Sequence, residues 1–264
     1  MSDTGDRRAL ERFLSRNSVT DAASLPLIHT TRSYNIASIK STDEIKPTRC
    51  PVFNEDLTYL FVGRPAYKRK DSGSQAEYWE LPCCFIFDHL INSSFKRVFP
   101  FDSGAFKSCL YPEYIGLMPI EQFEINSNGA PGRIISAFFG SAERYFSGSA
   151  KEADSFENEF DLSVLETEVR ALRRLAHDGT PANFDDRRFT IEVQINKTID
   201  FSATPPNAVI LPSIYLRDEA IKNKIISDWK ALPITYEVFS LSLSAYDGII
   251  YGKVHEYLKS KGAI

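Results

Sequence analysis

Two stretches of the sequence decide the fold: Leu27-Ile28-His29-Thr30-Thr31, which the pair Asn35-Ile36 follows, and Tyr59-Leu60-Phe61-Val62-Gly63-Arg64-Pro65-Ala66-Tyr67. The first predicts a short buried strand that leads into a helix over residues 33–39. The second predicts a strand of aromatic and aliphatic residues that ends at the Gly-Arg-Pro corner. Together they place a histidine on one strand and an arginine and a tyrosine just after another.

Three further segments have the character of strands. Residues 78–87 form a near-continuous apolar run, which is typical of a strand covered on both faces. Residues 188–195 alternate, and this pattern puts Glu192 on the polar face, opposite the core. Residues 208–212 form another apolar strand. Residues 97–106 are too aromatic for a solvent loop, so we expect them to pack over the sheet or to line a cleft.

Amphipathic patterns predict helices over residues 162–175, 218–230 and 246–259. Residues 127–148 are rich in Gly and Ser and residues 151–161 are acidic, which predicts a mobile or inserted segment. The elements lack regular βαβ spacing, so the expected class is α+β, with helices packed around a split antiparallel sheet. We expect a polar N-terminal arm with one short helix over residues 1–24, and a single domain over residues 25–264 with an insertion around 107–160.

Composition limits the classes of function. The chain has 264 residues and a formal net charge of -4, which disfavours a surface built for strong non-specific phosphate binding. A nucleic-acid substrate would therefore need a local groove. The N-terminus lacks a signal-peptide core and no run approaches the ~20 apolar residues of a membrane helix, so we expect a soluble, cytoplasmic protein without membrane contacts.

Several common site motifs are missing from the sequence. It contains no GxGxxG, GxxxxGK[ST] or GxSxG motif, which disfavours Rossmann, P-loop and serine-hydrolase sites. The 4 cysteines form no CxxC pair, and the 4 histidines are scattered along the chain. We expect reduced thiols and no bound metal.

The order of the chemically active residues resembles that of the ADP-ribosyltransferase superfamily, and in particular the DarT-like toxins of the histidine-tyrosine-glutamate type. The matching residues are His29-Thr30-Thr31 with Asn35, Ile36 and Ile39, then Leu60 to Tyr67, then Ile191-Glu192-Val193. Each matching motif is short. The resemblance implies an ADP-ribosyltransferase-like split-sheet fold and NAD as the co-substrate.

The resemblance also implies a role for each residue. Glu192 would be the catalytic residue, because a carboxylate stabilises the oxocarbenium-like ribose formed when the glycosidic bond of NAD breaks. Tyr67 would stack on the cationic nicotinamide ring. His29 would bind the adenosine-side ribose, and Arg64 would meet the pyrophosphate with its planar donors. Thr30 and Asn35 complete the implied cofactor-binding set.

Each of these residues also has an ordinary structural interpretation. A histidine in an apolar strand is more often a satisfied core residue than a ligand. Glu192 would normally be solvated on a polar strand face, Tyr67 could cap the turn after Pro65, and Arg64 could pair with Glu55 or Asp56.

The implied activity is mono-ADP-ribosyl transfer from NAD to a nucleic-acid base or a protein acceptor, as in a toxin or phage-conflict effector with a neutralising antitoxin partner. The alternative is a catalytically silent module that binds a nucleotide or a protein on the same fold. The two differ in geometry. An enzyme needs His29, Tyr67 and Glu192 in one pocket, whereas a silent module could leave Glu192 paired with Arg188 or facing water.

Overall fold

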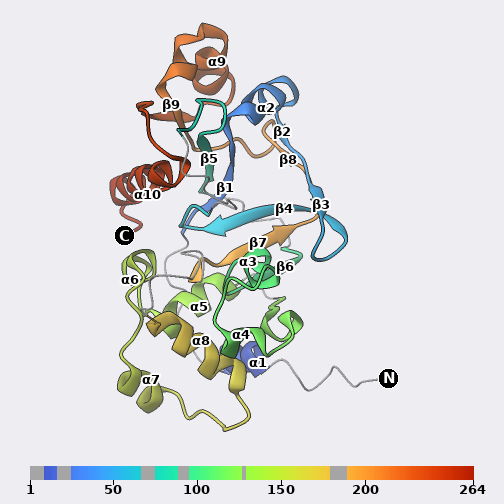
Figure 1. Cartoon of the computed structure of the whole chain (residues 1–264), viewed down its shortest axis with the longest axis vertical. Coiled ribbons are helices and arrows are strands. Elements are labelled where there is room, and N and C mark those ends of the chain that lie inside the picture. Colours follow the sequence, from blue (N-terminus) through green and yellow to red (C-terminus); the bar gives the residue numbers. More distant parts are fainter. Residues whose placement is uncertain (1–8, 17–24, 67–74, 89–94, 127–128, 179–188) are drawn as a thin grey trace. The chain divides into compact units, whose positions relative to one another are not determined.

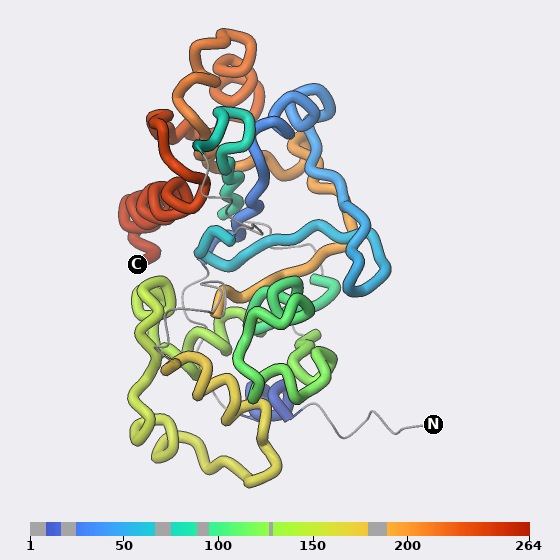
Figure 2. Tube along the Cα trace, in the orientation of Figure 1, coloured from blue at the N-terminus to red at the C-terminus, as the bar shows by residue number. Residues whose placement is uncertain are grey.

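The computed structural model describes residues 9–16, 25–66, 75–88, 95–126, 129–178 and 189–264. Their contacts group into two compact units, and each is described by itself. Unit 1 comprises residues 1–24, 94–194 and 263–264, and unit 2 comprises residues 25–93 and 195–262. Unit 2 thus combines the blue and cyan first part of the chain with its orange and red last part (Figure 2).

Unit 2 is built on a mostly antiparallel sheet with the strand order β10-β9-β5-β1-β4, in which β3 also pairs with β4 (Figure 1). Among the strand pairs in the described part of unit 2, β9 and β10 alone run parallel. The strands are β1 (Leu27–Arg32), β3 (Thr48–Cys50), β4 (Glu55–Val62), β5 (Pro82–Phe87), β9 (Ala208–Pro212) and β10 (Leu232–Tyr236). The short strands β2 (Glu44–Ile45) and β8 (Ile199–Asp200) form a separate antiparallel pair.

The centre of this sheet is its most apolar part. All six residues of β5 are buried, and β5 pairs with β1 along its whole length, from Leu27 opposite Phe87 to Arg32 opposite Pro82. A strand with neighbours on both edges and covered faces loses contact with water, which explains its continuous apolar sequence. The chain leaves β1 through a 3-10 turn, η2 (Ser33–Asn35), and enters helix α2 (Ile36–Thr42).

Further helices complete unit 2. The long helix α10 (Leu243–Ser260) contacts β5 and β10, and it buries Tyr246, Ile250, Val254 and Leu258 at helical spacing. The other elements are η5 (Ser213–Arg217), α9 (Glu219–Asn223) and the π-helical turn η6 (Lys224–Asp228).

Unit 1 is mainly helical. Its described residues include the strand β6 (Arg97–Phe99) and all of the strand β7 (Glu192–Ile195) except Ile195, and these strands pair antiparallel with Phe99 opposite Glu192. Its helical elements are α1 (Ala9–Arg16), α3 (Ser103–Lys107), α4 (Glu113–Gly116), η3 (Ile120–Phe123), α5 (Ala130–Phe138), α6 (Ala142–Ser147), α7 (Ala153–Glu159) and α8 (Thr167–His177). Phe13 of α1 packs against the rings of Phe138, Phe156 and Phe160, so the N-terminal helix belongs to the core of this unit.

The coarse fold prediction is confirmed: the chain is mixed α+β, with a mostly antiparallel sheet and surrounding helices. Residues 127–148 and 151–161, which were expected to be mobile or inserted, contain α5, α6 and α7, and these helices bury Ile135, Phe146 and Phe156. Residues 94–194 separate the two parts of unit 2 in the sequence, a longer interruption than the insertion expected at 107–160. No helix among the described residues has the length and apolar character needed to cross a lipid bilayer.

Candidate functional site

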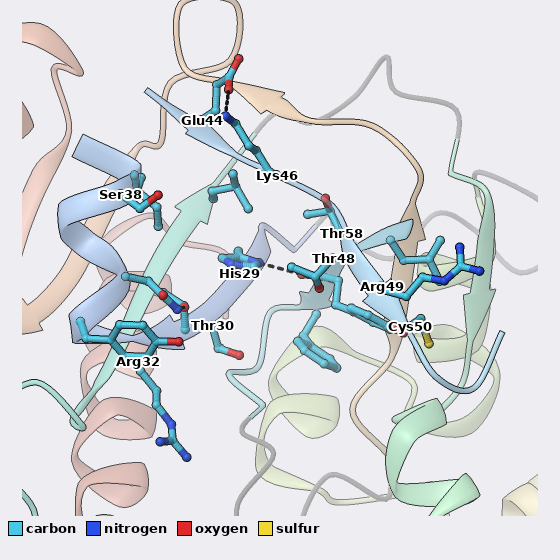
Figure 3. Close-up of a pocket in the computed structure, with 18 of the residues that line it drawn as sticks. His29, Thr30, Arg32, Ser38, Glu44, Lys46, Thr48, Arg49, Cys50 and Thr58 are labelled. Atoms are coloured by element: carbon cyan, nitrogen blue, oxygen red, sulfur yellow. Dashed lines mark hydrogen bonds and ion pairs between the residues drawn. The ribbon is translucent and has the colours of Figure 1, made fainter. Parts of the chain in front are cut away.

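A pocket with a volume of about 560 Å³ opens in unit 2. Its walls come from β1, η2 and α2 on one side and from residues 44–51 and β4 on the other. Figure 3 shows His29 near the middle of these residues, with Thr30 and Arg32 to one side and Thr48, Arg49 and Cys50 to the other. Three of the predicted cofactor-binding residues line this pocket: His29, Thr30 and Asn35.

His29 is a partly buried residue of β1, and its Nδ1 lies 3.0 Å from the backbone carbonyl oxygen of Tyr59 on β4. A carbonyl oxygen can only accept, so Nδ1 carries the proton and donates it. Burial lowers the pKa of His29, and the hydrogen bond to Tyr59 opposes that shift without reversing it. The ring is therefore neutral at pH 7, and its Nε2 can accept a hydrogen bond from a ligand.

Local hydrogen bonds hold the neighbouring polar residues in place. The Thr30 hydroxyl donates to the backbone carbonyl of Ala66, which ties the corner after β4 to β1. Asn35 donates from Nδ2 to Thr31 Oγ1 at 2.7 Å, which joins the η2 turn to the end of the strand. These bonds fix the backbone of one pocket wall before any ligand binds.

The pocket is rich in cations. Arg32, Lys46 and Arg49 line it together with one carboxylate, Glu44. Lys46 lies 3.3 Å from Glu44, and Arg49 lies 3.7 Å from Asp56, but both cationic side chains are 60% exposed. Exposed ion pairs of this kind contribute about 0–1 kcal/mol. An anionic ligand can therefore bind these cationic side chains with little loss of free energy from the ion pairs that it breaks.

Arg64 lies apart from this pocket in the structure. It follows β4 directly after Gly63, whose φ of +61° is readily adopted by glycine. Arg64 is 7% exposed, and its guanidinium carbon lies 5.4 Å from the centre of the Tyr251 ring on α10. It does not line the pocket, and its expected alternative partner Asp56 pairs with Arg49. Tyr67 lies outside the described residues.

Glu192 belongs to unit 1 and is fully buried, with 0% of its surface exposed. Its carboxylate accepts hydrogen bonds from the Ser103 backbone N–H (3.1 Å), the Ser103 hydroxyl (2.6 Å) and the Gln194 side-chain amide (2.5 Å). The expectation that Glu192 lies on a solvated strand face is wrong, because α3 begins over that face and places Ser103 on the carboxylate. Arg188, its other expected partner, lies outside the described residues.

The sequence analysis did not identify several residues that form the pocket around His29 and the cluster around Glu192. Arg32, Tyr34, Lys46 and Arg49 line the pocket, but no motif marks them. Gln194 could have been inferred as a neighbour of Glu192, because residues two apart on a strand share a face. Ser103 could not, since it is 89 residues away in the sequence.

Among the described residues, no group of three or more His, Cys, Asp or Glu side chains is placed to hold a metal ion. Comparisons of the chain with protein-family models, with curated proteins and with solved structures found no match.

Proposed function

We propose that the pocket of unit 2 binds NAD and that the chain is a mono-ADP-ribosyltransferase, on an ADP-ribosyltransferase-like split-sheet fold. The observation that carries the proposal is the convergence of His29, Thr30 and Asn35 on one pocket with three cationic side chains. Those three residues are the part of the implied cofactor set that the pocket brings together.

The chemistry of the lining suits the parts of NAD. Its pyrophosphate is anionic, and Arg32, Lys46 and Arg49 can supply charge-assisted hydrogen bonds to phosphate oxygens. Its ribose hydroxyls are donors, and neutral His29 offers Nε2 as an acceptor. The lining thus supports binding of the donor substrate.

The catalytic half of the proposal assigns Glu192 to the ribosyl cation. Glu192 already accepts three hydrogen bonds in a closed environment. Catalysis therefore requires that the carboxylate exchange a bond to Ser103 or Gln194 for one to the ribose. The acceptor is a nucleic-acid base or a protein side chain; the resemblance favours nucleic acid, and the net charge of -4 disfavours an extended duplex. A toxin role with a neutralising partner follows from the resemblance alone.

A second candidate is a nucleotide-binding module without catalysis. The specific observation in its favour is the state of Glu192, which is 0% exposed and hydrogen-bonded within its own unit. A glutamate used only to join α3 to β7 would look the same. In this case the pocket would still bind its nucleotide, and no ADP-ribose would be transferred.

One experiment separates the two candidates. The wild-type chain, Glu192→Gln and the matched control Glu143→Gln, which changes an exposed glutamate of unit 1, are incubated with labelled NAD and separate pools of DNA, RNA and protein. NAD binding is measured by calorimetry, and nicotinamide release and label transfer are followed in parallel. Transfer by wild type and Glu143→Gln but not by folded Glu192→Gln supports the enzyme.

The remaining outcomes are equally clear. Binding of NAD without release or transfer in any pool supports the silent module. A folded wild-type chain that does not bind NAD rejects the donor site and the enzyme, and a chain that also binds no other nucleotide rejects the silent module.

A further inference from the structure

Tyr34 is the most exposed large aromatic residue that lines the pocket. Its side chain is 60% exposed, although it forms part of the wall of a cavity. A tyrosine ring is flat and amphipathic, so one that is exposed at a pocket can contact a ligand through its face. Tyr34 is not among the residues that the resemblance implies.

The backbone around Tyr34 is firmly held. Tyr34 lies in η2, where the N–H of Ser33 donates to the carbonyl of Leu81 at 2.8 Å and the N–H of Tyr34 donates to that of Trp79 at 2.9 Å. Ser33 itself is buried. The side chain of Tyr34 is therefore presented from a fixed turn, so stacking a ligand on it would order few additional groups.

The nearby aromatic residues are already engaged with one another. Tyr78 packs edge-on against Trp79, with ring centres 5.0 Å apart, and against Tyr215 at 6.0 Å. No aromatic ring within the described part of the chain packs against Tyr34. Tyr34 thus differs from its neighbours in having a ring that faces the pocket and solvent rather than another ring.

We propose that Tyr34 is the base-stacking residue of this pocket, and that it takes the uncharged adenine-type base of the nucleotide. This inference rests on the proposed NAD site and extends it by naming the subsite of one ring. A ligand that satisfies Arg32, Lys46 and Arg49 at one part and Tyr34 at another is both anionic and flat aromatic, which is the chemistry of a nucleotide.

Charge decides which ring of NAD fits. Arg32 lies two residues before Tyr34, and both line the pocket. A guanidinium repels the cationic nicotinamide ring, whereas it can stack on an uncharged purine or bind the adjacent phosphate. The adenine end of the ligand is therefore assigned to Tyr34.

The test compares ligands that differ only in the base. AMP and ribose 5-phosphate are titrated into wild type, Tyr34→Ala, Tyr34→Phe and the control Tyr78→Ala, with thermal unfolding as the check on folding. Tyr78 is 40% exposed but does not line the pocket. We expect Tyr34→Ala to weaken AMP binding about 5- to 150-fold, the range for loss of one stacked base, and to leave ribose 5-phosphate binding unchanged. Tyr34→Phe and Tyr78→Ala should bind AMP like wild type.

The failures are distinguishable. If wild type binds AMP and Tyr34→Ala binds it equally well, the stacking assignment is overturned and the nucleotide site stands. An equal loss of AMP and ribose 5-phosphate binding in Tyr34→Ala also overturns the assignment, because the base is then not what Tyr34 contacts. If wild type binds neither AMP nor NAD, the nucleotide site fails and the stacking assignment falls with it.

Discussion

The pocket around His29 in unit 2 and the cluster around Glu192 in unit 1 each contain an ionisable side chain on a strand. They differ in whether that side chain is accessible to a ligand. His29 makes a hydrogen bond to a backbone carbonyl and lines an open pocket, so one ring nitrogen can serve a ligand. Glu192 accepts three hydrogen bonds and is closed to solvent. A polar residue on a strand is available for binding only where nothing in the fold covers it.

The cover over Glu192 comes from the aromatic segment that follows β6. Phe101 is fully buried, with ring centres 5.4 Å from Phe106 and 5.0 Å from Phe123. Asp102 caps α3 by accepting a hydrogen bond from the Ala105 N–H at 2.8 Å. With its backbone anchored on both sides, Ser103 is held against Glu192. The cluster therefore has the features of a structural joint between α3 and β7.

The largest predicted effect is the loss of stability when the hydrogen bonds between α3 and Glu192 of β7 are removed. Glu192→Ala would leave the Ser103 N–H and the Ser103 hydroxyl without their acceptor in a buried place, and the Gln194 amide would keep only its 3.2 Å hydrogen bond to Ser103 Oγ. Each buried polar group that loses its hydrogen-bond partner costs about 1–3 kcal/mol. We therefore expect the free energy of unfolding to fall by about 3 kcal/mol or more. Urea unfolding followed by circular dichroism measures the change.

Glu192→Gln tests the same contact between α3 and β7 with a smaller change to the side chain. It keeps the shape and one acceptor oxygen, so its cost should be clearly below that of Glu192→Ala, and Glu143→Gln should cost almost nothing. Unchanged stability in Glu192→Ala would show that the hydrogen bonds of the cluster do not hold unit 1 together. Glu192 would then be a stronger candidate for a functional carboxylate.

The second predicted effect concerns pH and the His29 pocket. The folded pKa of His29 lies below the value of about 6.5 for a free histidine, so the folded chain binds this proton less readily than the unfolded chain. Its contribution to stability is complete above that pH and is lost progressively as the pH falls below it. The free energy of unfolding, measured by urea unfolding from pH 7.5 to 5, should decline across this window.

A His29→Gln variant supplies the control. It should cost about 1 kcal/mol at pH 7.5, because the bond to the Tyr59 carbonyl is altered, and it should show a shallower decline on acidification. NAD binding by wild type should weaken over the same window, because protonated Nε2 can no longer accept. Identical pH profiles for wild type and His29→Gln would contradict the assignment of this proton to His29.

The sequence predicts the strands well and the site only in part. The runs 57–62 and 208–212 are apolar because most of their side chains are buried, and β4 and β9 form over them. The middle of β1 carries His29 and Thr30, and the η2 turn that follows the strand carries Asn35, so residues close in the sequence supply these three to one pocket. Short sequence separation made this part of the pocket predictable.

The rest depends on contacts that a linear pattern does not contain. The helix predicted over residues 162–175 begins only at Thr167, as α8, and Leu165 before it is 80% exposed. Glu192 fits the polar face of an alternating strand, and only the distant Ser103 turns that face into an interior. Arg64 follows its strand as predicted, but the long helix α10, almost two hundred residues later in the chain, supplies the ring it packs on. Long-range packing decided these outcomes.

The smallest predicted effect concerns the far end of α2, where Asp43 has a left-handed backbone with φ of +56°. Its carboxylate accepts hydrogen bonds from Lys224 Nζ at 2.8 Å and from Trp229 Nε1 at 2.7 Å. Burial opposes ionisation of Asp43, but the hydrogen bonds from Lys224 and Trp229 outweigh it and lower the pKa. Its neighbours Thr42 and Glu44 line the pocket, so this contact fixes one end of the pocket wall.

Because the folded pKa of Asp43 is lowered, its contribution to stability is present above about pH 4 and is lost as the pH falls further. The Asp43 side chain is 39% exposed, so water screens its ion pair and Asp43→Asn should lower the free energy of unfolding by only about 0.5–1 kcal/mol at pH 7. Lys222→Met, which breaks an exposed pair with Glu219, is the matched control and should change less. If Asp43→Asn also weakens NAD binding, although position 43 does not line the pocket, the binding site depends on how α2 is anchored. Unchanged NAD binding would show that the pocket wall near β1 is sufficient for binding NAD. The comparison with Glu192 would then apply only to His29 and its immediate neighbours.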